Sequence, residues 1–83
     1  MMFTTSRYAS ADTRRVALKL ARENDGLFVS RGKRTIAGLA DMARKKGEES
    51  ISIIEEENGI PCRISSIRVS ELGNWEWTGE KKL

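Results

Sequence analysis

The most informative absence in this 83-residue chain is histidine, which does not occur at all. Histidine is the side chain that most often transfers protons near neutral pH. Its absence removes the Ser-His-Asp and Cys-His systems of nucleophilic catalysis and every His-ligated zinc site. Cys62 is the only cysteine, so the chain forms no internal disulfide and has no thiol cluster. The sequence therefore predicts no structural metal, no cofactor and no enzymatic activity.

Long apolar runs are missing as well. No stretch approaches the roughly 18 residues that a membrane span needs. The first residues lead into Thr4-Thr5-Ser6-Arg7, which is unlike the apolar core of a secretion signal. Apolar residues make up 39% of the chain and charged residues 33%, a composition typical of soluble domains. We therefore expect a single cytoplasmic domain spanning residues 1–83, with no membrane contact.

Charge is divided unevenly along the chain. Residues 1–47 carry 11 Lys and Arg against 4 Asp and Glu, a net charge of +7, whereas residues 48–83 carry 4 against 8, a net charge of −4. A basic region in a small domain is typical of a surface that faces a polyanion such as a nucleic acid. The opposite charges would also let two copies of the chain attract each other.

The first half of the chain predicts two strands that alternate with two helices. Residues 2–6 favour a short strand, and a helix follows from a cap at Ser10 or Asp12. Residues 27–30 form an apolar run between glycines, which indicates a buried strand. Thr35 caps a second helix, whose apolar residues recur at intervals of three and four.

The second half predicts a β-hairpin. Residues 50–56 and 63–70 are rich in isoleucine and β-branched residues, and the turn dipeptide Asn58-Gly59 lies between them. Trp75-Glu76-Trp77 indicates a last short strand, after which residues 78–83 are expected to fray. The fold class is therefore α/β, with the order β-α-β-α-β-β and a possible final strand.

Basic side chains follow the first two predicted strands. Arg7 comes after the first strand, and the cluster Arg31-Gly32-Lys33-Arg34 comes after the second. Strands joined through a helix are usually parallel, so their carboxyl ends lie at the same edge of the sheet. This edge is where α/β sheets bind ligands, beside helix N-termini that attract anions. We therefore expect a cationic, phosphate-binding site here.

Two further cations, Arg14 and Arg15, fall in the first turn of the first predicted helix. A cation there opposes the helix dipole by about 0.3 to 1 kcal/mol, and a bound phosphate would offset this cost. Arg44-Lys45-Lys46 at the end of the second helix complement the dipole and need no ligand. For each cation taken singly, an ordinary solvated surface is the alternative. The candidate phosphate-binding residues are Ser6, Arg7, Arg14, Arg15, Arg31, Lys33 and Arg34, assisted by backbone amides.

Two other patterns have plainer interpretations. A phosphate-binding P-loop requires four residues between its glycines, but five separate Gly26 from Gly32, and Arg34 stands where a hydroxyl would hold magnesium. An enzyme acting on a phosphorylated metabolite is disfavoured for this reason and by the lack of histidine. Glu55-Glu56-Glu57 is interpreted as a solvated hairpin end, since neighbouring side chains of a strand point to opposite faces.

Several short motifs occur in the order found in one protein family. Thr4-Thr5-Ser6-Arg7 is followed by a basic helix, by Val29-Ser30-Arg31-Gly32-Lys33, by Leu39, and by an isoleucine-rich strand that leads to Gly59-Ile60-Pro61. This order resembles the N-terminal half of the Brix-domain proteins of ribosome biogenesis, particularly the short archaeal ones. The resemblance covers about residues 2–70.

The resemblance implies a half of the Brix architecture, similar to the anticodon-binding domains of class II aminoacyl-tRNA synthetases. It implies binding to ribosomal RNA or its precursor, with no catalysis. The family's basic motifs fall on Thr5-Ser6-Arg7 and Ser30-Arg31-Gly32-Lys33, where the residues themselves predict an anion site. A Brix domain has two similar halves, whereas this chain has the length of one. One hypothesis is therefore a homodimer that rebuilds the two-half architecture.

The sequence is also compatible with a different function. The chain could be a protein-interaction subunit of a larger ribonucleoprotein assembly that never touches RNA directly. Trp75 and Trp77, together with the edge of the sheet, would then contact the partner. The same two tryptophans could instead stack on bases of a nucleic acid.

Overall fold

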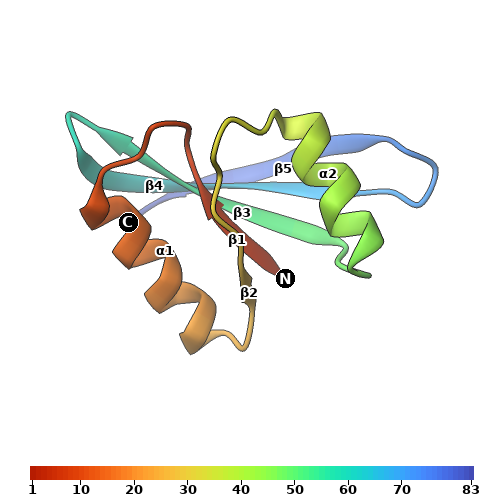
Figure 1. Cartoon of the computed structure of the whole chain (residues 1–83), viewed down its shortest axis with the longest axis horizontal. Helices are drawn as coiled ribbons and strands as arrows, with labels where there is room; N and C mark the ends of the chain where they lie inside the picture. Colours follow the sequence, from red (N-terminus) through yellow and green to blue (C-terminus); the bar gives the residue numbers. More distant parts are fainter.

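The predicted alternation of strands and helices is present in the structure, a computed structural model that describes residues 1–83 (Figure 1). The elements are β1 (Met2–Thr5), α1 (Ala11–Glu23), β2 (Leu27–Phe28), α2 (Ile36–Lys45), β3 (Ser50–Glu57), β4 (Ile60–Val69) and β5 (Trp75–Lys82). This confirms the α/β class and the order β-α-β-α-β-β, with the additional strand at the end.

Both helices begin at capping residues that the sequence indicated. The side chain of Ser10 accepts a hydrogen bond from the amide of Thr13 at the start of α1, and Thr35 accepts one from Gly38 at the start of α2. Such a cap stabilises a helix by about 1 kcal/mol. Neither helix has the length and apolar character needed to cross a membrane.

The strand order is β2-β1-β3-β4-β5, which places β1 between its two parallel neighbours β2 and β3. The connection through α1 leads from β1 to β2, and the connection through α2 leads back past β1 to β3. Right-handed crossovers in opposite directions place their helices on opposite faces of a sheet. Figure 1 looks onto the β2 edge, and α1 and α2 lie on either side of β1 and β2. This doubly covered centre explains why all four residues of β1 are buried.

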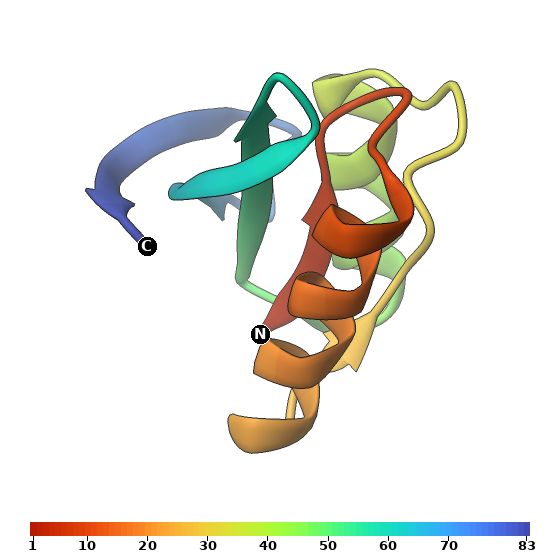
Figure 2. The same cartoon turned by 90° about the vertical axis from the view of Figure 1, so that its left-hand side faces the viewer.

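The main core lies between α2 and the sheet. Because successive residues of a strand point to opposite faces, Ile51 and Ile53 of β3 point toward α2. They form a buried cluster whose other members are Met2, Leu39, Ala40, Ala43, Ile67 and Val69. The other face of β1 and β3 contacts α1 through the small buried side chains of Thr13, Ala17 and Ala21. The sheet is strongly twisted, and β5 curves away from α1 (Figure 2).

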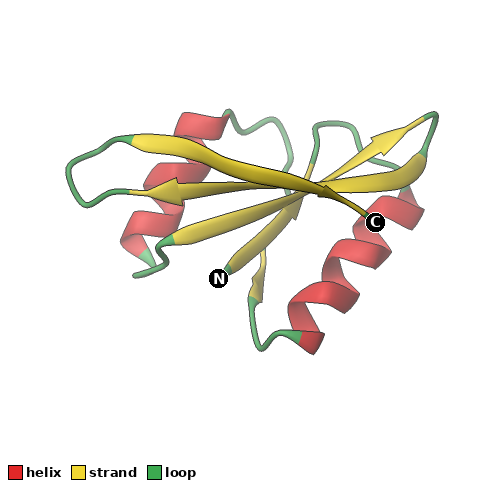
Figure 3. Cartoon of the chain, turned by 180° about the vertical axis from the view of Figure 1, so that it is seen from behind, coloured by secondary structure: helices red, strands yellow, loops and turns green.

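β5 extends further than the sequence predicted. It runs to Lys82, which pairs with Arg63 of β4, so the expectation that residues 78–83 fray is corrected. The pairing depends on hydrogen bonds between backbone N–H and C=O groups, which residues with polar side chains can make as well as residues with apolar ones. Side chains from Glu76 onward are exposed, so no alternation of apolar residues reveals the strand. Seen from behind, β5 forms the free outer edge of the sheet (Figure 3).

Candidate functional site

The loops that follow β1 and β2 lie side by side at one edge of the sheet, as the parallel pairing predicted (Figure 1). Arg31 joins them, because its Nη1 donates to the carbonyl of Thr5 at 2.9 Å and its Nε donates to the carbonyl of Arg34 at 2.8 Å. Arg7 Nε reaches the same Arg34 carbonyl at 3.4 Å. The two basic motifs therefore form one cationic edge, which we call the Arg7–Arg34 edge.

A shallow cavity of about 310 Å³ opens between these two loops. Four of the predicted site residues line it, namely Ser6, Arg14, Arg31 and Lys33. The backbone N–H groups of residues 31–33 donate to no acceptor within the protein. Cationic side chains and free backbone donors are the groups that hold phosphates in proteins. The cavity can therefore accept an anion without displacing any hydrogen bond made by these amides.

Arg31 is the most constrained cation of the Arg7–Arg34 edge. Its partial burial lowers the pKa of its guanidinium, the charge of Arg7 lowers it further, and the carboxylate of Glu55 raises it. Arginine remains charged at neutral pH. The positive charges of Arg7 and Arg31 therefore lie close enough to repel each other, and an anion bound in the cavity beside Arg31 would reduce this repulsion, although Arg7 itself does not line the cavity.

The N-terminus of α1 is already occupied by a carboxylate that the sequence did not reveal. Glu56 on β3 accepts hydrogen bonds from the Ser10 amide at 3.1 Å and from Thr13 Oγ1 at 2.6 Å. The hydrogen bonds from Thr13 and then Ser10 lower the pKa of Glu56, and the charge of Arg14 adds to this effect. The negative charge of Glu56 thus stabilises the positive end of the α1 dipole without any ligand. The argument that a phosphate is needed at this helix end does not hold.

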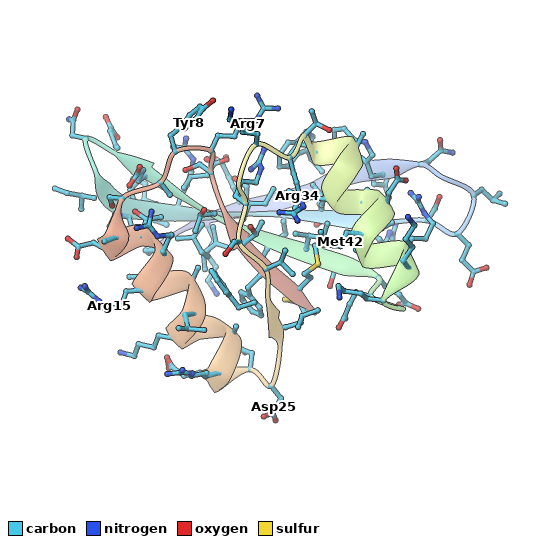
Figure 4. The ribbon with its side chains drawn as sticks, viewed as in Figure 1. Arg7, Tyr8, Arg15, Asp25, Arg34 and Met42 are labelled. Atoms are coloured by element: carbon cyan, nitrogen blue, oxygen red, sulfur yellow. The ribbon has the colours of Figure 1, made fainter.

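Arg14 and Arg15, which were both predicted to bind phosphate, lie in different places. Arg14 lines the cavity, and its Nη1 donates to the carbonyl of Ala9 at 2.6 Å. Arg15 forms an exposed ion pair with Asp12 at 2.9 Å and does not line the cavity. Figure 4 shows Arg15 on the far side of α1 from the labelled Arg7. Of the two, only Arg14 remains a candidate for contact with a ligand in the cavity.

The remaining cations differ in how freely they can meet a ligand. Lys33 is exposed and makes no hydrogen bond or ion pair within the protein. Arg7 is also exposed, with a single long hydrogen bond. Arg34 donates from Nη1 to the carbonyl of Ser30 at 2.8 Å, so it shapes its own loop and does not line the cavity. Ser6 lines the cavity, but its amide is bound to the carbonyl of Ile54.

Tyr8 is the residue at this site that sequence reasoning missed. Its side chain is 81% exposed and lines the same cavity. Figure 4 shows its ring beside Arg7, at the tip of the loop after β1. The available signal was the position of the only tyrosine, directly after a basic residue at the end of a strand.

Comparison with known proteins finds no protein family and no curated protein that matches the sequence. Solved structures do match. One is an archaeal Imp4-like protein called Mil, with a TM-score of 0.76 and 29% identity over 90% of this chain and 46% of that protein. Another is a probable ribosomal biogenesis protein from Aeropyrum pernix K1, with a TM-score of 0.86 and 23% identity over 95% of this chain and 44% of that protein.

These structural neighbours confirm the resemblance to Brix-domain proteins of the Imp4-like type, and they confirm the small α/β fold. The chain spans less than half the length of each neighbour. It therefore has the size of one part of those proteins, in agreement with the half architecture that the resemblance implies.

Proposed function

From the fold it shares with archaeal Imp4-like proteins, we propose that this protein binds ribosomal RNA or its precursor during ribosome biogenesis, without catalysing a reaction. The observation that carries the proposal is the Arg7–Arg34 edge, where two basic loops meet around a cavity with free backbone donors. The proposal retains the cytoplasmic location expected from the sequence.

Affinity comes from contacts to phosphates. Arg7 and Lys33 bind phosphates through exposed charges that few protein contacts restrain. Arg31 and the backbone amides beside it hold a phosphate in the cavity, which Arg14 also lines. Such contacts position a protein on RNA without reading its sequence. With about four contacts to single-stranded RNA, log affinity falls against log salt with a slope of roughly −3.

The experiment that tests the proposal is a titration of a labelled fragment of precursor ribosomal RNA at two salt concentrations. The variant is Arg7→Glu/Lys33→Glu, which reverses the two least restrained charges. Arg31 is unsuitable, because its hydrogen bonds hold the two loops together. The matched control is Lys19→Glu/Lys46→Glu, which makes the same change of net charge at exposed residues outside the cavity.

Wild type and control should bind with similar affinity and with the salt dependence given above, and the site variant should lose this binding. If the site variant and the control variant bind RNA equally well, the Arg7–Arg34 edge is not the RNA-binding surface. Absence of binding by the wild type would favour a protein-interaction role.

We also propose that two copies of the chain form a homodimer, in which each copy takes the place of one half of a Brix domain. The chain spans less than half of its structural neighbours, and β5 leaves the edge of the sheet unpaired. The basic region 1–47 and the acidic region 48–83 would attract each other between copies. Light scattering over a wide concentration range measures the mass, and a monomer throughout would count against the homodimer.

The second candidate function is a protein-interaction subunit, favoured by exposed apolar side chains beside the β5 edge. Trp77 is 53% exposed and packs edge-on against Trp75, with the ring centroids 5.8 Å apart. Leu72 in the preceding turn is 91% exposed. Trp77→Ala tests this role better than a change of Trp75, which packs against the core. Loss of assembly with unchanged RNA binding would support the interaction role.

A further inference from the structure

Tyr8 is placed unusually for an aromatic residue in so small a protein. Its side chain is 81% exposed, although aromatic rings usually contribute to stability by being buried. It stands on the rim of the cavity that Arg14, Arg31 and Lys33 line. The ring points away from the sheet beside the Arg7 side chain (Figure 4). The fold itself therefore gains little from this ring.

The backbone of Tyr8 is held in a conformation that a tyrosine rarely adopts. Its φ of 57° lies in the left-handed region, which is uncommon for any residue with a bulky side chain. Such a conformation persists only where the surrounding structure enforces it, and it is frequent at binding sites.

The loop that carries Tyr8 is fixed on both sides. Before it, the amide of Ser6 donates to the Ile54 carbonyl at 3.0 Å. After it, the carbonyl of Ala9 accepts from Arg14, and the side chain of Ser10 donates to the Gly59 carbonyl at 2.8 Å. The ring is thus presented from a rigid support, so little conformational entropy is lost when a ligand packs against it.

We propose that Tyr8 stacks on an unpaired base of RNA whose neighbouring phosphates bind in the cavity. Proteins that bind single-stranded nucleic acid combine a cationic groove for the backbone with aromatic side chains on which bases stack. Arg31, Lys33 and the free amides form the first part, and Tyr8 forms the second. A duplex hides the faces of its bases, so the site selects unpaired nucleotides. This inference rests on the proposed function and names its substrate class.

The test compares affinities for an unpaired RNA oligonucleotide and for a duplex of the same sequence. Tyr8→Asn removes the ring and keeps a side chain that tolerates the left-handed region, and Tyr8→Phe keeps the ring without the hydroxyl. Leu72→Asn is the matched control, because it removes an exposed apolar side chain outside the cavity. Circular dichroism and thermal unfolding confirm that each variant is folded.

Tyr8→Asn should bind the unpaired oligonucleotide about 5- to 150-fold more weakly than wild type, with an unchanged salt slope, and should bind the duplex as wild type does. Tyr8→Phe and Leu72→Asn should match the wild type on both RNAs. A loss that Tyr8→Phe shares would assign the contact to the hydroxyl and overturn stacking.

The two proposals fail in different ways. If Tyr8→Asn binds like wild type while Arg7→Glu/Lys33→Glu still loses salt-sensitive binding, stacking is overturned and the RNA-binding edge stands. If wild type binds neither RNA, both the proposed function and this inference are overturned.

Discussion

The N-termini of the two helices have the same kind of capping residue but different charged groups beside them. Both α1 and α2 follow a strand of the parallel part of the sheet, and both begin at a capping hydroxyl. At α1, Glu56 comes from β3 and places the protein's own carboxylate at the positive end of the helix. At α2, the first turn contains no acidic residue, and the preceding loop carries Arg31, Lys33 and Arg34.

The difference separates a structural electrostatic network from a candidate binding surface. Around α1, the Ser10 amide and the Thr13 hydroxyl donate to Glu56, and the Thr13 amide donates to the Ser10 hydroxyl, so no ligand is needed to complete these contacts. In the loop before α2, Lys33 and three backbone amides have no partner within the protein. The positive end of a helix is therefore no evidence for a bound phosphate where a carboxylate of the protein already faces it, and Arg14 is a candidate only because it lines the cavity.

One of the two largest expected effects on stability comes from Arg31→Ala, which disconnects the two loops. The variant loses hydrogen bonds from a charged donor to the carbonyls of Thr5 and Arg34. Hydrogen bonds to charged groups contribute about 1.5 to 3 kcal/mol each, and partial exposure reduces this. We expect urea unfolding to show a loss of about 2 kcal/mol. Lys33→Ala, which breaks no such bond, should stay within about 0.5 kcal/mol of wild type.

Removing the caps one at a time compares the two helices directly. Ser10→Ala should cost more than Thr35→Ala, because the Ser10 hydroxyl also donates to the Gly59 carbonyl and joins α1 to the β3-β4 hairpin. Loss of a cap alone costs about 1 kcal/mol, so we expect about 2 and 1 kcal/mol, respectively. Equal losses in urea unfolding would mean that the contact with the hairpin contributes nothing.

The carboxylate at α1 also makes a pH-dependent contribution. The hydrogen bonds from Thr13 and Ser10 lower the pKa of Glu56 below its ordinary value of 4.5 in the folded state. This contribution to stability is therefore fully present above pH 4.5 and is lost as the pH falls through the folded pKa. Thermal unfolding between pH 7 and pH 3 should show a smaller acid-induced decrease in Tm for Glu56→Gln than for wild type. Parallel curves would contradict the role assigned to Glu56.

Local signals in the sequence were sufficient for the order of the helices and strands along the chain and for the two basic loops, but not for the order of the strands in the sheet. The crossover rule placed Arg7 beside the loop that carries Arg31 and Arg34, because parallel strands bring their carboxyl ends to one edge. The role of Glu56 was not predictable, since its partner Thr13 lies 43 residues away and a run of three glutamates resembles a solvated turn. The left-handed backbone of Tyr8 was not predictable either, since such a conformation is uncommon for a tyrosine and the position of Tyr8 after a basic residue does not specify it.

The smallest expected effect separates the two arginines that sequence reasoning grouped together. Arg15 pairs with Asp12 on the exposed surface of α1, and such pairs contribute about 0.2 to 1 kcal/mol. Arg15→Ala should therefore change stability by a few tenths of a kcal/mol and leave RNA affinity at low salt nearly unchanged. Arg14→Ala removes a cation from the cavity wall, so the salt slope should become shallower by about 0.7. Equal affinity losses in the two variants would mean that net charge matters and that the cavity does not.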